Sequence, residues 1–336
     1  MRRGVGVVFK DKGVVSLEEF DIASLEPGRL LIKTLYTLIS PGTETAFLLG
    51  LPNTPATYPQ YPGYSNVGIV EDIASDIRGF SIGDIVASPS RHASIVAPRA
   101  ENTFKIPGSI DPIEASFFYL SAIALQGVRK SEPEIGESAV VLGLGLVGQL
   151  TAQLLALCGV IPVIGVDLYD YRIEVARSLS IDYGLNPSKI DTVSEVYRIT
   201  DGRGASIVIE STGNPEAINL ALKLAGRRGR VILLGSTRGL STVNFYSDVH
   251  RKGLIIIGAH NSIRPRSESS RWYWTIRDDV ELVFKLLSMK RLRVRELISS
   301  ILEYRQAEEA YKLLIDHKDR VISVVLDWRV ISDSLR

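Results

Sequence analysis

The sequence is poor in cysteine, histidine and methionine, and it has almost no net charge. Its 336 residues include a single cysteine, Cys158, so no disulfide can form within the chain. This favours a reducing compartment, and we expect a cytoplasmic protein. The 39 Lys and Arg residues nearly match the 38 Asp and Glu residues, for a net charge of +1. Because nucleic-acid binders normally carry excess positive charge, we expect no nucleic-acid partner.

Signal-peptide and membrane features are also absent. Charged residues at positions 10–12 interrupt the place where a signal peptide needs an apolar core, so we expect none. Residues 139–166 carry no charge and are long enough to span a bilayer. Glycines at the start of this stretch, polar residues in its middle and Gly159–Pro162 near its end break it, however. A strand, a buried helix and a second strand explain it better, so we expect no membrane partner.

Enough apolar residues are present for a folded chain. Hydrophobic residues make up 45% and charged residues 23%, as in ordinary globular proteins, and the length corresponds to two domains. In the first third, short β-branched runs alternate with Gly and Pro turns. This pattern predicts strands at Gly4–Lys10, Gly13–Glu18, Arg29–Ser40, Asn66–Ile73, Asp84–Ser88 and Ala93–Ala97. The segment Leu51–Pro62, rich in Pro, Thr and Tyr, is predicted to be a loop of the kind that often binds ligands.

The pattern of hydrophobic and turn residues changes after Pro107. The sequence Asp111-Pro112 combines an N-cap with proline at the first helical position and predicts a helix to about Lys130. Strands and helices then alternate, which is typical of a parallel sheet covered on both faces by helices. The strands are predicted at 138–143, 161–167, 205–211, 230–235 and 253–259, and the last part, which departs from this alternation, ends in a strand at 320–328. The helices are predicted at 146–158, 170–180, 190–199, 214–225, 278–290 and 306–316.

The fold class that we expect is therefore α/β, with a doubly wound parallel sheet and a β-rich domain. Residues 1–120 would begin the β-rich domain, residues 121–262 would form the doubly wound domain, and residues 263–336 would return to complete the first. A cleft between two such domains is a common ligand site.

A glycine-rich turn is the sharpest signal in the sequence. Gly143, Gly145 and Gly148 follow an apolar strand and open an apolar helix, the pattern of a dinucleotide site. Gly143 would permit the tight turn, Gly145 would let the backbone approach a pyrophosphate, and Gly148 would let helix and strand pack closely. The N–H groups of Leu146 and Val147 would face the phosphates. The alternative is a glycine turn that binds nothing.

The position of an acidic residue indicates which dinucleotide the site prefers. Asp167 ends the next strand, close to the ~20 residues expected after the glycine turn. Its carboxylate would accept hydrogen bonds from both hydroxyls of the adenine ribose and would repel a 2′-phosphate, which favours NAD over NADP. Arg172 could add a ribose or phosphate contact. Further turns follow apolar strands and are candidate contacts for cofactor and substrate, although ordinary turn chemistry also explains them: Thr212-Gly213, Gly235-Ser236-Thr237 and Gly258–Asn261.

The order of these segments resembles the medium-chain dehydrogenase/reductase superfamily over nearly the whole chain. Ile39–Glu44 (ISPGTE) and Pro62–Gly68 (PGYSNVG) resemble more closely its subgroup around 2-desacetyl-2-hydroxyethyl bacteriochlorophyllide a dehydrogenase. The resemblance implies a GroES-like catalytic domain, a Rossmann domain, an active site in the cleft between them, and a homodimer or homotetramer. It does not transfer the pigment substrate.

The sequence departs from the zinc alcohol dehydrogenases of this superfamily. Those enzymes have Cys-Gly-Thr-Asp where this chain has Pro41–Glu44, and Gly-His-Glu where it has Gly63–Ser65. Their third ligand would fall near Tyr119, and the four-cysteine structural zinc lobe is missing. Zinc requires thiolate, imidazole or carboxylate donors at set positions, so we predict no zinc. Glu44 and His92 could still hold a metal, but two scattered donors do not make a site.

Without zinc, hydrogen-bond donors or a general acid must stabilise alkoxide character. The resemblance assigns Thr43 a proton-relay position and puts Tyr64 where a zinc histidine would be. His92, in the stretch that borders the substrate pocket in the family, and His260, near the expected nicotinamide, could exchange a proton. Each has a plainer explanation: a capped turn for Thr43, space filling for Tyr64 and ordinary hydrogen bonding for the histidines.

Two other features have structural explanations of their own. Trp272-Tyr273-Trp274 could line a pocket for a flat substrate, or pack at a domain or subunit interface. Cys158, near Leu154 and Leu155, is expected to be a buried small hydrophobe.

Three functions remain open at this point. The first is a zinc-independent, NAD-dependent oxidoreductase that moves a hydride between nicotinamide and a secondary alcohol or ketone. The second is reduction of an enone or quinone, for which zinc-free relatives mostly use NADPH. The third is a protein that binds NAD without turnover. The substrate and the direction of reaction cannot be read from the sequence.

Overall fold

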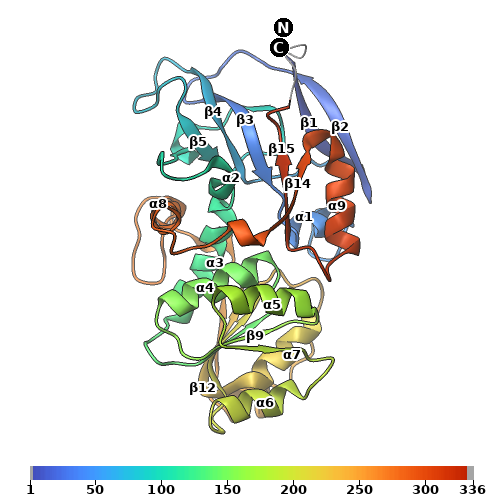
Figure 1. Ribbon diagram of the computed structural model, residues 1–336, viewed down its shortest axis with the longest axis vertical. Coiled ribbons are helices and arrows are strands. Elements are labelled where there is room, and N and C mark those ends of the chain that lie inside the picture. The colour runs from blue at the N-terminus through green and yellow to red at the C-terminus, as the bar shows by residue number, and fades with distance from the viewer. Residues whose placement is uncertain (1–2, 331–336) are drawn as a thin grey trace. The chain divides into compact units, whose positions relative to one another are not determined.

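The computed structural model of the protein describes residues 3–330, which form two compact units (Figure 1). The first unit contains the chain up to Leu120, Val280–Lys290 and the chain from Ile298 onward. The second contains Ser121–Asp279 and Arg291–Leu297. Each is described separately below.

The first unit is built on a seven-stranded sheet and a hairpin. The sheet has the order β14-β15-β3-β4-β5-β7, and β6 also pairs with β3. Its strands are β3 (Leu30–Leu38), β4 (Asn66–Ile73), β5 (Ile85–Ser88), β6 (Ile95–Val96), β7 (Phe104–Lys105), β14 (Ile298–Glu303) and β15 (Ser323–Asp327). The hairpin pairs β1 (Arg3–Asp11) with β2 (Val14–Asp21). The sequence did not predict β7 or β14, because the first has only two residues and the second lacks a clear alternating pattern.

The return segment belongs to the core of this unit. Strand β15 pairs with β3 in antiparallel fashion, and helix α9 (Ala307–Asp316) packs on β15. The core contains residues from both ends of the chain, since Phe9 contacts Tyr311 edge to face with ring centroids 5.0 Å apart. Trp328 is fully buried and stacks on Tyr304. The first unit therefore needs both segments to form its core.

The helix predicted from position 111 to about 130 is two helices. Asp111 caps α2 (Pro112–Ala115) by accepting a hydrogen bond from the Ile113 N–H, and α3 (Phe118–Ser131) begins after a break. At the break, the Ser116 hydroxyl donates to the Ile113 carbonyl, so it competes with the backbone ladder. Two further helices are α1 (Thr43–Leu48), which the sequence did not predict, and α8 (Ile276–Ser288).

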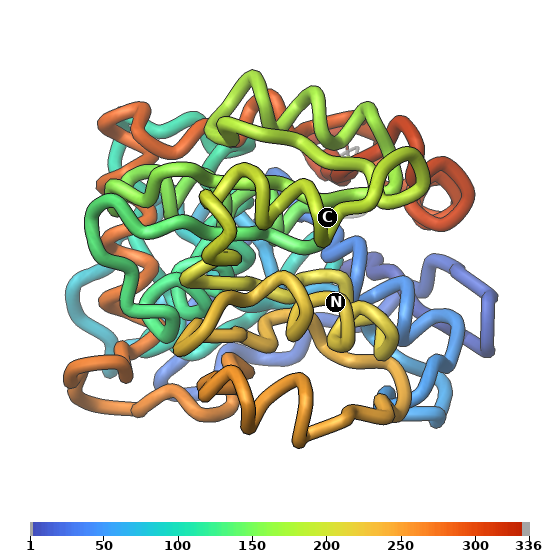
Figure 2. Tube along the Cα trace, turned by 90° about the horizontal axis from the view of Figure 1, so that it is seen from below, coloured from blue at the N-terminus to red at the C-terminus, as the bar shows by residue number. Residues whose placement is uncertain are grey.

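The second unit contains six parallel strands in the order β10-β9-β8-β11-β12-β13. Counted along the chain, this is the 3-2-1-4-5-6 order of the doubly wound dinucleotide fold. The strands are β8 (Ala139–Leu142), β9 (Val163–Val166), β10 (Tyr183–Leu185), β11 (Ala205–Glu210), β12 (Ala225–Leu233) and β13 (Ile255–Gly258). The predicted Rossmann architecture is therefore confirmed, and its winding can be followed from green to orange in Figure 2.

Helices cover this sheet. Contacts join α4 and α5 to β8, β9 and β10, and α7 to β8, β11 and β12. Their bounds are α4 (Leu146–Leu157), α5 (Asp170–Leu179), α6 (Thr192–Ile199) and α7 (Pro215–Leu224). Shorter helical turns of the two units lie at Ala100–Asn102, Phe245–His250, Asn261–Ile263, Arg295–Leu297 and Tyr304–Gln306.

The boundary expected after residue 262 differs from this division, because residues 263–279 belong to the second unit. Side chains of this segment bind α3 directly. Arg264 Nη2 donates to the Ala122 carbonyl at 2.6 Å, and Asp279 accepts from Arg129 Nε at 2.7 Å. Neither contact is visible in a local sequence pattern.

The long uncharged stretch folds as β8, α4 and β9, as the broken pattern indicates. Across residues 3–330, none of the helices combines the length and apolar character needed to cross a membrane. The expectation that Cys158 is buried is wrong, since its side chain is exposed. Helix α4 ends at Leu157, its buried residues end at Leu155, and Cys158 is the cap residue that follows.

Candidate active site

The glycine turn of the second unit has the shape that a dinucleotide requires. Gly143 follows β8 with a φ of +91°, a conformation that L side chains rarely adopt. A Cβ on Gly148 would lie 1.9 Å from the Gly143 carbonyl oxygen, so only glycine lets α4 approach the strand. At Gly145 the nearest atom to a Cβ is Arg172 Nη1 at 3.8 Å, which leaves the backbone accessible. The tight turn and the close packing are those predicted for Gly143 and Gly148, and the approach of a pyrophosphate at Gly145 stays a prediction.

The helix that follows presents free N–H groups. Gly145 is the N-cap of α4, and no side chain among the described residues caps this end. The first N–H groups of a helix lack intrahelical partners and carry the positive end of the helix dipole. Leu146 and Val147 occupy the first two helical positions, so their N–H groups can bind an anion above the turn.

Asp167 is fixed beside the same turn. It follows β9, is only 8% exposed, and accepts hydrogen bonds from Leu144 N at 2.7 Å and Tyr169 N at 2.9 Å. Each carboxylate oxygen keeps a further lone pair for a ribose hydroxyl. Arg172 Nη1 lies 3.9 Å from Asp167 Oδ2. The structure therefore brings the glycine turn, Asp167 and Arg172 together, as expected.

Glu210, beside the same turn, is a residue that sequence reasoning missed. It ends β11, is fully buried, and its Oε1 accepts from the backbone N–H groups of Thr212 at 2.7 Å and Gly213 at 3.2 Å and from the Thr212 hydroxyl. Burial raises the pKa of the Glu210 carboxyl above its ordinary value, against these hydrogen bonds. An acid closing an apolar strand, as at Asp167, was a signal that could have found it.

The turns after the central strands meet at one edge of the sheet. The Ser211 hydroxyl donates to Gly143 O at 2.7 Å, which joins the ends of β8 and β11. A Cβ on Gly213 would lie 2.6 Å from Ser236 O, and one on Gly235 would lie 2.5 Å from Gly213 N. The predicted candidates Thr212, Gly213, Gly235 and Ser236 therefore surround the topological switch point, where doubly wound sheets bind ligands.

Two predicted catalytic residues of the first unit, Thr43 and Tyr64, lie together. Thr43 begins α1, and the Tyr64 phenol forms hydrogen bonds with the side chains of Ser40 and Thr43. Burial and, next, the negative charge of Glu44 raise the pKa of the Tyr64 phenol well above its ordinary value, and the two hydrogen bonds oppose this only in part. The phenol therefore stays protonated near neutral pH and can donate a hydrogen bond.

The buried carboxylate of Glu44 lies close enough to Tyr64 to act on its pKa. Glu44 is 2% exposed, and its Oε2 is 2.8 Å from His92 Nε2 and accepts a hydrogen bond from the Tyr311 hydroxyl at 2.5 Å. Its Oε1 accepts from Ser40 N at 2.8 Å. Glu44 and Tyr311 were not among the predicted catalytic residues. Buried charges are expensive unless they are paired, and such clusters concentrate at functional sites.

His92 is held on several sides. It is fully buried, its N–H donates to the Pro62 carbonyl, and its own carbonyl accepts from Val7 N. A Cβ on Gly63, whose φ is +106°, would lie 2.5 Å from His92 N, so the close approach requires glycine. Nδ1 has no hydrogen-bond partner among the described residues. A histidine with one nitrogen on a carboxylate and the other buried and unpaired is a candidate to hold a proton.

His260 is placed differently from the other candidates. It belongs to the second unit and is exposed, and its Nδ1 accepts from Ser262 N at 3.2 Å and lies 2.7 Å from the Ser262 hydroxyl. The ring thus caps the short helix Asn261–Ile263. The cluster of the first unit forms without it, and its role in proton exchange stays a prediction.

The positions that the resemblance links to zinc do not offer a zinc donor set. Tyr64 and Tyr119 pack edge to face with ring centroids 5.3 Å apart, so two of these positions converge, but as phenols. Pro41, at the third position, has no donor side chain. No group of three or more His, Cys, Asp and Glu residues within residues 3–330 could hold a metal ion. The residues present do not fit catalytic zinc.

Comparisons with known proteins agree with this architecture. Residues 147–274 match the family model described as zinc-binding dehydrogenase. The chain is 26% identical over 263 residues to D-guloside 3-dehydrogenase of Escherichia coli, covering 77% of this chain and 75% of that protein. It is 28% identical over 331 residues to L-threonine 3-dehydrogenase of Pyrococcus horikoshii, covering 89% and 91%.

The fold comparison extends over both units. A crystal structure of an alcohol dehydrogenase from Escherichia coli complexed with NADH matches with a TM-score of 0.84 at 18% identity, covering 97% of this chain and all of that one. The chain is thus similar to medium-chain dehydrogenases of the zinc type in sequence, and to their fold over nearly its whole length. The predicted superfamily, its Rossmann and GroES-like domains and an enzyme of the alcohol dehydrogenase/reductase type are thereby confirmed. The bacteriochlorophyllide dehydrogenase-like subgroup stays a prediction.

Proposed function

We propose that the protein is a zinc-independent, NAD-dependent oxidoreductase that transfers a hydride between nicotinamide and a secondary alcohol or ketone. The observation that carries this proposal is the environment of Tyr64. Its phenol stands at a position that the family gives to a zinc-binding histidine, is hydrogen-bonded to Ser40 and Thr43, and is kept protonated by burial and by Glu44. It can therefore act on a substrate oxygen as a donor.

The cofactor preference rests on Asp167. Its carboxylate is anchored by two backbone N–H groups at the end of β9 and would face the adenine ribose of a dinucleotide seated on the glycine turn. A 2′-phosphate there would meet a fixed negative charge, which favours NAD. Arg172, close to both Asp167 and Gly145, would neutralise part of the phosphate charge.

The substrate oxygen is the atom whose developing negative charge must be stabilised during the reaction. When a secondary alcohol is oxidised, its carbon loses a hydride and its hydroxyl loses a proton, and alkoxide character develops before the ketone forms. Bound nicotinamide supplies the hydride acceptor at C4. Tyr64 and Thr43 donate hydrogen bonds to the oxygen as its charge grows, which is the contribution that a Lewis acid makes elsewhere.

The buried network of Glu44, His92 and Tyr311 provides an acceptor for the proton that the substrate hydroxyl loses. Glu44 binds His92 through Nε2, and the buried, unpaired Nδ1 is the group that receives the proton released by the substrate hydroxyl. Tyr311 and Ser40 N hold the carboxylate in place. In ketone reduction the same proton returns to the oxygen.

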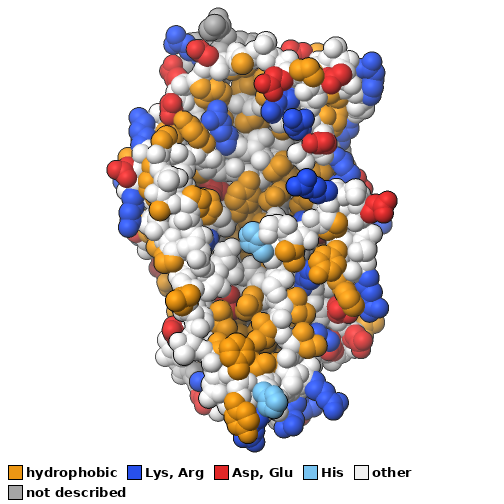
Figure 3. All heavy atoms as spheres, turned by 180° about the vertical axis from the view of Figure 1, so that it is seen from behind, with side chains coloured by type: hydrophobic (Ala, Val, Ile, Leu, Met, Phe, Trp, Pro, Cys, Tyr) orange, Lys and Arg blue, Asp and Glu red, His pale blue; other side chains and the backbone are white. Residues whose placement is uncertain are grey.

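We also propose that the protein self-associates through β13. This strand is the outer edge of the six-stranded sheet, and Ile255 and Ile256 on it are 54% and 38% exposed. Hydrophobic side chains gather on the lower part of the molecular face in Figure 3. An open edge that carries exposed isoleucines is a ready template for pairing with a second copy.

The test is a panel of alcohols, ketones and enones with NAD(H) and NADP(H), followed by nicotinamide absorbance. We expect turnover of secondary alcohols or ketones with NAD(H), and a Tyr64→Phe variant should lose about 10²-fold in kcat, the effect of removing one oxyanion donor. Tyr246→Phe, which changes an exposed tyrosine of the second unit, is the matched control. Turnover with NADPH and enones alone would support the enone reductase instead. NADH binding without turnover of any substrate would support a non-catalytic protein.

A further inference from the structure

Glu210 is a buried acid that the proposed reaction does not use. It ends β11, and its side chain is fully buried. Within residues 3–330, no Lys, Arg or His forms an ion pair with it, and its only electrostatic partners belong to the turn that follows it. Burying a charge costs free energy unless the charge is paired or hydrogen-bonded. The hydrogen bonds of Glu210 therefore indicate what this residue does.

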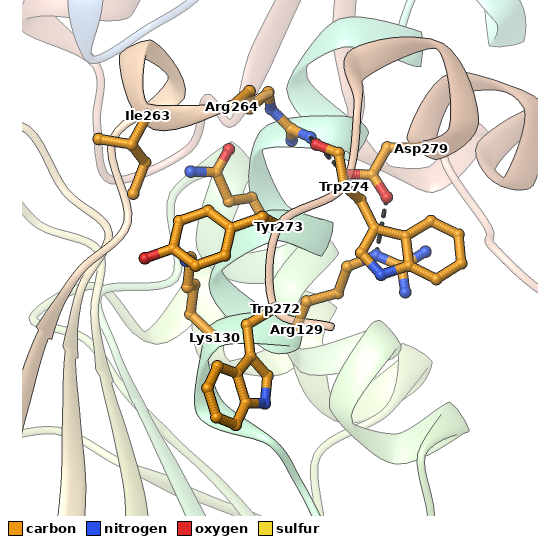
Figure 4. A pocket seen from close by; sticks show the side chains of 9 residues that line it. Arg129, Lys130, Ile263, Arg264, Trp272, Tyr273, Trp274 and Asp279 are labelled. Atoms are coloured by element: carbon orange, nitrogen blue, oxygen red, sulfur yellow. Dashed lines mark hydrogen bonds and ion pairs between the residues drawn. The ribbon is translucent and has the colours of Figure 1, made fainter. Parts of the chain in front are cut away.

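The buried charge of Arg129, in the same unit, is compensated in another way. Arg129 Nε donates to Asp279 at 2.7 Å, and its guanidinium carbon lies 3.5 Å from the centroid of the Trp274 ring (Figure 4). Opposite charge and an aromatic face stabilise this cation inside a closely packed contact. Glu210 has no such counter-charge among the described residues, so its carboxylate depends on the donors of its own turn.

One oxygen of Glu210 organises the turn Ser211–Gly213. Oε1 accepts hydrogen bonds from Thr212 N at 2.7 Å, from Gly213 N at 3.2 Å and from the Thr212 hydroxyl. Gly213 has a φ of +69°, and its N–H is held in this conformation by the carboxylate. Oε2 is buried and has no partner within residues 3–330. The side chain therefore acts as an acceptor through Oε1 alone.

The turn Ser211–Gly213 packs in its own right on the glycine turn. A Cβ on Gly143 would lie 2.6 Å from Thr212 Cγ2, so the Thr212 methyl group lies directly against the Gly143 backbone. The Ser211 hydroxyl donates to the Gly143 carbonyl at 2.7 Å. A Cβ on Gly148 would lie 3.0 Å from Ser211 Oγ, so Ser211 also fits closely against the start of α4. The residues that follow Glu210 therefore support the glycine turn from one side.

We propose that Glu210 is a positioning residue for the dinucleotide site: its carboxylate fixes the turn Ser211–Gly213, and this turn holds the glycine turn in the shape that receives a pyrophosphate. The inference rests on the nicotinamide dinucleotide binding of the proposed function. A turn that is ordered before the cofactor arrives loses less conformational entropy on binding, so the cofactor binds more tightly. Glu210 acts through Thr212 and takes no part in hydride transfer.

Titration of the full-length protein with NADH, followed by NADH fluorescence, measures the effect. Glu210→Leu fills the buried space with an apolar side chain but removes the acceptor, and should raise the Kd for NADH at least about tenfold. Glu210→Gln keeps an oxygen for the same donors, and its NH₂ group replaces Oε2, which accepts no bond. Its Kd should stay within about threefold of the wild type. Glu134→Leu, which changes an exposed glutamate before β8, is the matched control.

Two further measurements separate positioning from a general loss of structure. With saturating NAD, the kcat of Glu210→Leu should stay within about threefold of the wild type while the KM for NAD rises, because the turn contributes to binding alone. Thr212→Val removes one donor to Glu210 at an exposed position, keeps a methyl group against Gly143, and should weaken NADH binding about threefold. In the Glu210→Leu background the same change should have almost no effect, since the acceptor is already absent.

Several results would overturn the proposal. These are an unchanged Kd in Glu210→Leu, equal losses in Glu210→Leu and Glu210→Gln, or additive effects of Glu210→Leu and Thr212→Val. A fall in kcat that parallels a lower free energy of unfolding in urea would also overturn it, since Glu210 would then be structural only. If Glu210→Leu does not fold, wild-type NADH binding by Thr212→Val decides against the proposal. A wild-type protein that binds no NADH would refute the proposed function itself, and this inference with it.

Discussion

The hydroxyl of Tyr311 donates a 2.5 Å hydrogen bond to the carboxylate of Glu44, across 267 positions of the sequence. Both side chains are almost completely buried, and His92 binds the same carboxylate oxygen. Helix α9 therefore completes a polar network whose other members come from the first hundred residues. The return segment contributes chemistry as well as packing to the first unit.

Replacing Tyr311 with phenylalanine should weaken this unit and the reaction together. Hydrogen bonds to buried charged groups contribute about 1.5–3 kcal/mol, so Tyr311→Phe should lower the free energy of unfolding by that amount. The activity should fall as well, because Glu44 no longer holds His92 firmly. Urea denaturation and steady-state kinetics measure both effects, with Tyr183→Phe, at an exposed position, as the control. Wild-type stability together with wild-type kcat would contradict the proposed role.

The raised pKa of Tyr311 predicts that the protein loses stability at alkaline pH. Burial, and then the charge of Glu44, raise the pKa of Tyr311 well above its ordinary value. Above the unfolded pKa of about 10, the unfolded chain releases this proton while the native state keeps it, so stability falls as pH rises. Below that pH the contribution is fully present. One proton corresponds to a slope of about 1.4 kcal/mol per pH unit.

Urea denaturation on either side of about pH 10 measures this slope. Tyr311→Phe has no proton to release at this site, so its stability should decline less steeply than that of the wild type. Equal slopes in the two proteins would show that Tyr311 ionises as freely in the native state as in the unfolded chain.

Changing Asp167 should alter the choice of cofactor. Asp167→Asn keeps an acceptor for one backbone N–H but removes the negative charge, so NADP should bind better and NAD worse. We expect the ratio of kcat/KM for NAD to that for NADP to fall at least about tenfold, equivalent to 1.4 kcal/mol. Asp170→Asn, three residues later and exposed to solvent, is the control. An unchanged ratio would mean that Asp167 only organises the turn.

Metal analysis tests zinc independence directly. The converging Tyr64 and Tyr119 rings offer no thiolate or imidazole, so the purified protein should contain far less than one zinc per chain. Dialysis against a chelator should leave kcat unchanged. Stoichiometric zinc that is removed together with the activity would refute the proposed mechanism, and Glu44 and His92 would then be the first ligands to examine.

Self-association should depend on β13. A lysine at position 256 puts a charge on the exposed sheet edge and should shift the protein toward monomer in sedimentation velocity experiments. Ile135→Lys, at an even more exposed position of the same unit, is the matched control. If both variants sediment like the wild type, the contact between copies lies elsewhere.

The geometry of the glycine turn could be predicted because its signals are local. Gly143, Gly148 and Asp167 contact neighbours in the same strand–turn–helix unit, so their spacing alone predicts that they lie together. The network around Glu44 could not be predicted in this way. In the sequence, a glutamate in a six-residue helix looks like an ordinary surface charge. Only the tertiary structure brings Tyr311 and His92 into hydrogen-bond contact with it. Side chains that meet only through tertiary structure leave no periodic pattern.

The order of the two units along the chain has a consequence for biosynthesis. The six-stranded sheet of the second unit is continuous from β8 to β13, so it can fold as soon as that stretch has left the ribosome. The first unit cannot, because β15 and α9 follow the whole of that sheet. Until they emerge, Glu44 lacks its tyrosine and the early strands expose an unfinished core. A nascent chain halted between the two stages would be an efficient target for chaperones.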